Sequence, residues 1–240
     1  MRFKKYIAEA TVEPRKKDIT VCEKTFKDVF KRYKKGEWGM GLAGVKKAMK
    51  EASHQISKNL KDIRMDFTSK DKFRPEAYSM PMEHQTYIKV EYSAADTRDA
   101  WQMKTNKTWI YQMMELIKHE LVHAETYRRI MKASKKDYDK FFDILLANKN
   151  MSKKFSNEFD GYLADHLEIM AHAKHAAEQL LSPLSDFSKE EIIDKLRGKD
   201  MVELTYESDA FESYFYHIKV DYPKVWKKFI KYLVEYIRKK

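Results

Sequence analysis

Apolar and polar positions repeat along most of the chain with the three- and four-residue spacing of amphipathic helices. This spacing predicts helices over residues 23–34, 42–64, 106–131, 136–148, 162–181, 208–219 and 222–238. The stretch GEWGMG separates the first two of them. Ser188 and Glu191 form a capping-box pattern that predicts a short helix ending at Gly198. Pro223 suits the first turn of the last helix.

One segment, HQTYIKVEYS at residues 84–93, has the clearest strand pattern, because its apolar and β-branched residues alternate with polar ones. Residues 2–13 and 18–23 predict two further short strands. Together these elements predict an α+β fold that is mostly helical, with a small sheet. No repeat or long linker interrupts the chain, so we expect a single domain over residues 10–240 with a helical C-terminal part.

The composition narrows the class of protein. Apolar residues make up 43% of the chain and charged residues 35%, which is typical of a globular protein. No apolar run approaches the roughly 20 residues of a membrane span, and no secretory signal follows the basic start. The single cysteine, Cys22, excludes an internal disulfide framework and a cysteine-rich zinc site. The net charge of +11 favours non-specific contact with polyanions such as DNA.

Candidate chemistry lies in the predicted helix over residues 106–131. His119, Glu120 and His123 spell H-E-x-x-H. Residues four apart share one face of a helix, so the two imidazoles can converge on one metal ion. Glu120 stands one step round from His119, where it can take a proton from a water on the metal.

A catalytic zinc needs a third protein ligand and one open position for water. Because cysteine is nearly absent, the candidates are histidine, aspartate and glutamate. The predicted helix over residues 162–181 carries Glu168, His172 and His175 on one stripe. Spacing alone leaves His172 open as a rival ligand or as a residue behind the ligands.

The pairing of H-E-x-x-H with a later E-x-x-A, Glu168 to Ala171, resembles the gluzincin metallopeptidases. The resemblance covers about residues 106–181. It implies a zincin-like fold in which His119, His123 and Glu168 hold Zn²⁺. Glu120 would act as the general base in the hydrolysis of a protein or peptide substrate.

Other residues could assist this site. His172, His166 and Tyr162 could support the ligands or donate a hydrogen bond to a developing oxyanion. Tyr127 shares the His123 face, where packing is the expected role. In zincins an extended edge strand binds the substrate backbone, and residues 84–93 precede the active-site helix in the order that suits this role.

The first ten residues, MRFKKYIAEA, resemble the capsid-targeting leaders of internal head proteins from large contractile-tailed phages. Such leaders bind the prohead scaffold and are cut by the phage maturation protease after Ile/Leu-x-Glu, before a small residue. Ile7, Glu9 and Ala10 fit this signal. The resemblance implies a cleavable leader over residues 1–9 and a place in the capsid interior.

Two alternatives stay open. A basic, DNA-associated internal head protein could keep a structural or vestigial metal site. Its C-terminal stretch carries Trp226, Phe229, Tyr232 and Tyr236 among basic residues, a spacing that also suits the core face of a helix. An intracellular regulatory protease of the host cytoplasm would keep the leader residues.

Overall fold

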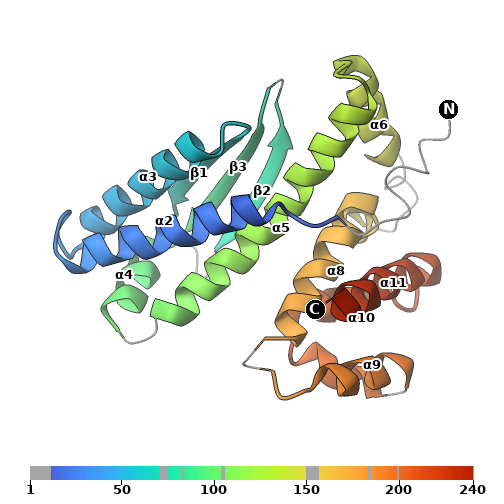
Figure 1. The fold of residues 1–240 in the computed structure, drawn as a ribbon. Helices are drawn as coiled ribbons and strands as arrows, with labels where there is room; N and C mark the ends of the chain where they lie inside the picture. Colours follow the sequence, from blue (N-terminus) through green and yellow to red (C-terminus); the bar gives the residue numbers. More distant parts are fainter. Residues whose placement is uncertain are drawn as a thin grey trace. The chain divides into compact units, whose positions relative to one another are not determined.

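The computed structural model describes residues 12–70, 75–82, 84–103, 106–149, 157–182, 185–198 and 200–239. It confirms an α+β fold that is mostly helical with a small sheet (Figure 1). The chain divides into two compact units. Pro14–Tyr127 forms the sheet unit, and Arg128–Lys240 forms the helical unit with the segment that ends at Glu13. The single domain over residues 10–240 stays a prediction. No described helix is both long and apolar enough to cross a membrane.

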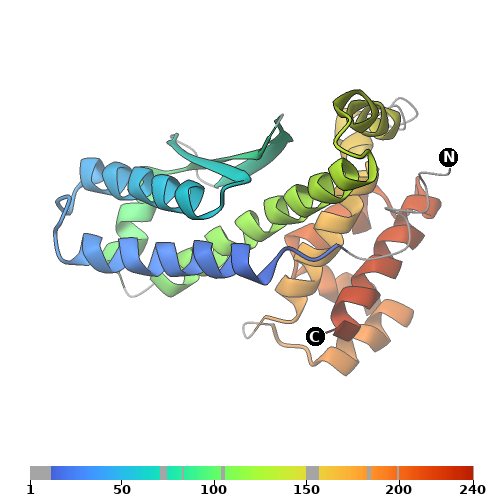
Figure 2. The same ribbon diagram turned by 45° about the horizontal axis from the view of Figure 1, so that its top comes forward.

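The sheet unit contains three strands and four helices, counted over its described residues. The elements are α2 (Lys16–Lys34), α3 (Leu42–Asn59), β1 (Ile63–Ser69), β2 (Glu76–Pro81), β3 (Thr86–Tyr92), α4 (Ala94–Gln102) and α5 (Asn106–Ala133), whose last residues enter the helical unit. The strand order is β1-β3-β2, with β1 parallel and β2 antiparallel to β3. Figure 2 shows α2, α3 and α5 on one side of the sheet.

The core of this unit lies between that side of the sheet and the helices. Ile63 and Met65 of β1 and Ile88 and Val90 of β3 are fully buried, and their strand neighbours point to the opposite face. Trp101 is the largest buried side chain and packs edge-on against Trp109 of α5, with ring centroids 5.1 Å apart. Burying such a ring contributes about 2–3 kcal/mol. The first turns of α5 are thereby packed against α4.

Two predictions of secondary structure in this unit are wrong: the strand over residues 18–23 and the end of the helix over residues 42–64. Residues 18–23 form the first half of α2, not a strand, because Cys22 belongs to a buried stripe that continues at helical spacing through Phe26, Val29 and Tyr33. The helix predicted over residues 42–64 ends at Asn59, and its last residues turn into β1. The strand predicted over residues 2–13 falls almost entirely outside the described residues.

The predicted strand over residues 84–93 is confirmed as β3, but its expected place at the sheet edge is wrong. β3 pairs with β1 on one side and with β2 on the other. It is therefore the central strand, and its backbone hydrogen-bonding groups are used inside the sheet. Among the described strands, β2 is the edge strand that follows β1 and precedes α5.

The helical unit is built from helices that the sequence pattern largely predicts. Its elements are α6 (Tyr138–Lys149), α7 (Glu158–Leu163), α8 (His166–Leu180), α9 (Lys189–Arg197), the 3₁₀ helix η2 (Asp200–Thr205), α10 (Asp209–His217) and α11 (Pro223–Lys239). The capping box of Ser188 and Glu191 is present, and Pro223 is the first residue of α11. α8 and α11 lie side by side (Figures 1 and 2).

The helix predicted over residues 162–181 is wrong at its start. The helix is interrupted at Ala164 and Asp165, so α7 and α8 are separate helices. Asp165 caps α8, because its side chain accepts a hydrogen bond from the Leu167 amide at 2.9 Å. Tyr162 consequently belongs to α7, while His166 and Glu168 stand in the first turn of α8.

Candidate metal centre

Helix α5 places His119, Glu120 and His123 on a rigid element. Its apolar stripe buries Met113, Ile117 and other residues in the core of the sheet unit. The three polar side chains are also buried, with exposed fractions of 7%, 3% and 4%. Burying polar side chains costs free energy unless hydrogen bonds, ion pairs or a metal ion satisfy them.

The two histidines are close enough to share one ion. The Nε2 atoms of His119 and His123 lie 3.2 Å apart, and the ring centroids are 5.0 Å apart. Two imidazole nitrogens on a tetrahedral zinc, each about 2.0–2.1 Å from the metal, are separated by about 3.3 Å. The observed distance therefore suits two ligands of one ion. Tyr127 stacks on His123 at 6.4 Å, in agreement with a packing role.

Glu120 carries a free acceptor. Its Oε2 atom is buried and has no hydrogen-bond partner among the described residues. A buried carboxylate oxygen without a partner costs about 1–3 kcal/mol or more. This unfavourable free energy falls on Glu120, the residue that the H-E-x-x-H pattern predicts to be a proton acceptor.

A third candidate ligand is held at the start of α8. Glu168 Oε2 lies 3.8 Å from His172 Nε2, and the same nitrogen lies 3.3 Å from the hydroxyl of Tyr162. His172 therefore touches both a neighbouring carboxylate and the short helix before it. This arrangement brings two of the predicted supporting residues, His172 and Tyr162, beside Glu168.

A residue that sequence reasoning missed completes the surroundings of Glu168. Tyr214 of α10 packs its ring 5.6 Å from that of His172 and donates a hydrogen bond of 2.6 Å to the Leu163 carbonyl. Full burial, with the charge of Glu168 adding, raises the Tyr214 pKa well above its ordinary value. The phenol stays protonated and remains a donor. Nothing in the sequence spacing links Tyr214 to Glu168.

The three predicted ligands form a group that could hold a metal ion. Among the described residues, His119 and His123 of the sheet unit and Glu168 of the helical unit make up this group. Within the described residues, His172 is not part of this group. The donor set of two imidazoles and one carboxylate is one that zinc accepts and that leaves a position for water.

The other predicted site residues lie elsewhere. His166 is the first residue of α8, and its ring centroid lies 6.2 Å from that of Tyr232 in α11. Glu9 and Ala10, the predicted leader cleavage residues, lie outside the described residues. Their roles stay predictions.

The aromatic residues of α11 bear on the DNA-binding alternative. Phe229, Tyr232 and Tyr236 are buried, and Phe229 stacks on Tyr214 with ring centroids 4.0 Å apart. Rings that stack on nucleic-acid bases must be accessible. These three instead form the core face of α11.

Comparison with known proteins finds no family model, no curated protein and no solved structure that matches the chain.

Proposed function

We propose that this protein is a zinc-dependent metallopeptidase of gluzincin type with a zincin-like fold. The ligands would be His119, His123 and Glu168. The observation that carries the proposal is the 3.2 Å separation of the two Nε2 atoms on one turn of α5, beside the unpartnered carboxylate oxygen of Glu120. A purely structural metal site has no use for a buried base at that position.

The chemistry divides between the ion and the chain. Zinc, when bound, supplies Lewis acidity that favours ionisation of water and polarises a peptide carbonyl. Glu120 would accept the proton of the attacking water at Oε2 and pass it to the nitrogen of the departing amine. The Oε2 atom of Glu120 is buried and has no hydrogen-bond partner among the described residues, so this oxygen is available to accept the proton.

The residues around Glu168 would orient it. Tyr162 and Glu168 flank His172, so the imidazole can donate to one of them while it contacts the other. Tyr162 is 44% exposed, which leaves its hydroxyl within reach of a substrate. His166 is the first residue of α8 and is a weaker candidate for stabilising charge. A peptide substrate would add to β2, the edge strand, in place of β3.

The test compares Glu120→Gln with wild type, using zinc-loaded protein and a mixture of quenched peptides. Glu120→Gln should keep the fold and the zinc but lose about 10² to 10⁴ in hydrolysis rate, since an amide cannot accept the proton. Glu125→Gln is the matched control, because Glu125 lies on the same helix and pairs with Arg15 at 3.2 Å. A Glu120→Gln protein that cleaves as fast as wild type would remove Glu120 from the mechanism.

We also propose that the protein is phage-encoded and is packaged after removal of residues 1–9. The resemblance of the leader supports this, with a prohead scaffold and a maturation protease as partners. Val12 is buried, and its carbonyl accepts a 2.7 Å hydrogen bond from Tyr236. Cleavage between Glu9 and Ala10 would keep Val12 in the chain and would therefore leave this contact intact. Mass spectrometry of protein from purified particles should find Ala10 as the first residue. A Met1 start in particles would dismiss the processing.

A further inference from the structure

A small cavity of about 90 Å³ opens in the sheet unit, away from the predicted ligands. Three segments meet there: the residue before β2, the junction of β3 with α4, and the first turns of α5. The lining residues are Pro75, Tyr92, Ser93, Asp96, Thr97, Trp109, Gln112 and Met113.

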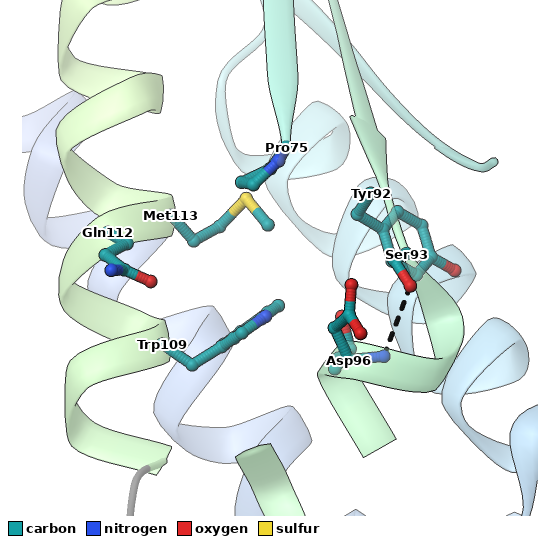
Figure 3. Close-up of a pocket in the computed structure, with 8 residues that line it drawn as sticks. Pro75, Tyr92, Ser93, Asp96, Trp109, Gln112 and Met113 are labelled. Carbon is teal, nitrogen blue, oxygen red and sulfur yellow. Dashed lines mark hydrogen bonds between the residues drawn. The ribbon is translucent and has the colours of Figure 1, made fainter. Parts of the chain in front are cut away.

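The walls of the cavity are largely apolar. Figure 3 shows Trp109 and Met113 of α5 on one side and Tyr92 and Asp96 on the other, with Pro75 above them. Tyr92 and Met113 are buried, whereas Trp109 is partly exposed. Such walls suit an aliphatic chain that enters from solvent and lies against an indole ring.

Two polar side chains of the cavity, Asp96 and Thr97, offer acceptor oxygens. Asp96 is exposed and forms no ion pair with any described residue. Thr97 is only 1% exposed, and its Oγ1 atom has no hydrogen-bond partner among the described residues. The Asp96 amide already donates to Ser93 Oγ at 3.2 Å, so this donor at the start of α4 is used. A carboxylate and a buried oxygen both call for a ligand with N–H donors.

We propose that this cavity is a recognition pocket for the side chain of a lysine or arginine in the peptide substrate. The aliphatic stem would lie against Trp109 and Met113. The charged head would donate to Asp96 and Thr97 and would face the Trp109 ring in a cation–π contact. An anion is disfavoured, because the carboxylate of Asp96 would repel it.

The position of the pocket along α5 relates it to the metal ligands, and this step rests on the proposed function. Gln112 lines the pocket, and seven residues later the same stripe of the helix carries His119. Seven residues rise about 10 Å along a helix. An extended peptide covers that length in about three residues. The basic residue would therefore stand about three positions from the scissile bond.

A binding experiment tests the pocket without any need for hydrolysis. Agmatine, which carries a guanidinium and an ammonium at the two ends of a four-carbon stem, is titrated into the protein by calorimetry, with butanol as the uncharged comparison. Wild type should bind agmatine and not butanol. Asp96→Asn should bind agmatine at least about tenfold more weakly, and Thr97→Val should also weaken it. Asp99→Asn on the same helix is the control, because that carboxylate contacts Arg98 at 2.7 Å and does not line the pocket.

A cleavage experiment tests the substrate assignment. Peptides that carry arginine or its uncharged analogue citrulline at successive positions are offered to zinc-loaded protein. Arginine should raise kcat/KM about tenfold at one position only, and Asp96→Asn should abolish that preference. Agmatine binding without cleavage of any peptide would keep the pocket and reject the peptidase. Cleavage without a preference for arginine, or no agmatine binding, would overturn the inference.

Discussion

Helices α5 and α8 each carry a pair of candidate site residues four positions apart, but the two pairs have different surroundings. In α5, His119 and His123 face each other through their Nε2 atoms at 3.2 Å. In α8, the nitrogen of His172 faces both Glu168 at 3.8 Å and the hydroxyl of Tyr162 at 3.3 Å. The same spacing brings two side chains together in both helices. Under the proposed function, these neighbours decide whether both side chains of a pair bind the ion or whether one of them positions the other.

The largest effect should come from breaking the α5 pair. His123→Ala leaves one imidazole on α5, so zinc affinity should fall by several orders of magnitude. Competition with a chromogenic chelator measures this. His54→Ala is the control, because His54 is an exposed histidine on α3. Full zinc occupancy in His123→Ala would place the metal elsewhere.

The α8 pair should respond unequally. Glu168→Ala should lose zinc about as severely as His123→Ala, whereas His172→Ala should lose only about 10- to 100-fold, as expected of a residue that orients a ligand. His172→Gln should recover part of the affinity, since an amide can still donate to the carboxylate. The reverse order of the two alanine variants would make His172 the third ligand.

The scaffold behind the α8 pair gives a smaller effect, on stability. Tyr214→Phe keeps the ring stacked on Phe229 but removes the donor to the buried Leu163 carbonyl. The free energy of unfolding should fall by about 1–3 kcal/mol. Denaturant titration measures it, and Tyr216→Phe, at an exposed position on the same helix, should change little. Equal stability of the two variants would show that the Leu163 carbonyl needs no donor.

The smallest effect is expected in the pH dependence of stability, measured on metal-free protein so that loss of the metal does not contribute. Hydrogen bonds from Lys70 and Lys89 lower the pKa of Glu91 in β3 from its ordinary value of 4.5 to about 2. A lowered pKa stabilises the fold above pH 4.5, and this contribution is lost as the pH falls from 4.5 towards 2. Metal-free wild type should lose stability in that window, and Glu91→Gln should show a flatter profile. An unchanged profile would assign the acid sensitivity to other carboxylates.

The sequence predicts what local periodicity determines. The pair on α5 could be predicted because both histidines lie in one helix, where spacing alone fixes their distance. Glu168 was predicted as the third ligand through the resemblance to gluzincins, since it lies 45 positions after His123 and no local rule spans such a gap. Tyr214 had no signal for the same reason.

The misplaced strands have a related cause. Ile63, Met65 and Phe67 of β1 alternate with polar residues, but the amphipathic pattern of α3 runs into them without a glycine or proline. Pairing with β3, more than twenty residues later, decides that this segment is extended. The cavity around Asp96 could not be predicted either, because it gathers residues from three separate segments.

The path of the chain sets an order of synthesis. Val12 belongs to the helical unit, the next residues, Pro14–Tyr127, build the sheet unit, and the chain then returns to the helical unit. A ribosome therefore makes the whole sheet unit, with both candidate histidine ligands, before it reaches Glu168. The hydrogen bond from Tyr236 to Val12 can close only after a further stretch of translation, because its partners lie 224 positions apart in the sequence. Under the proposed function, the nascent chain would have no complete zinc site, and therefore no hydrolytic activity, until α8 had been made.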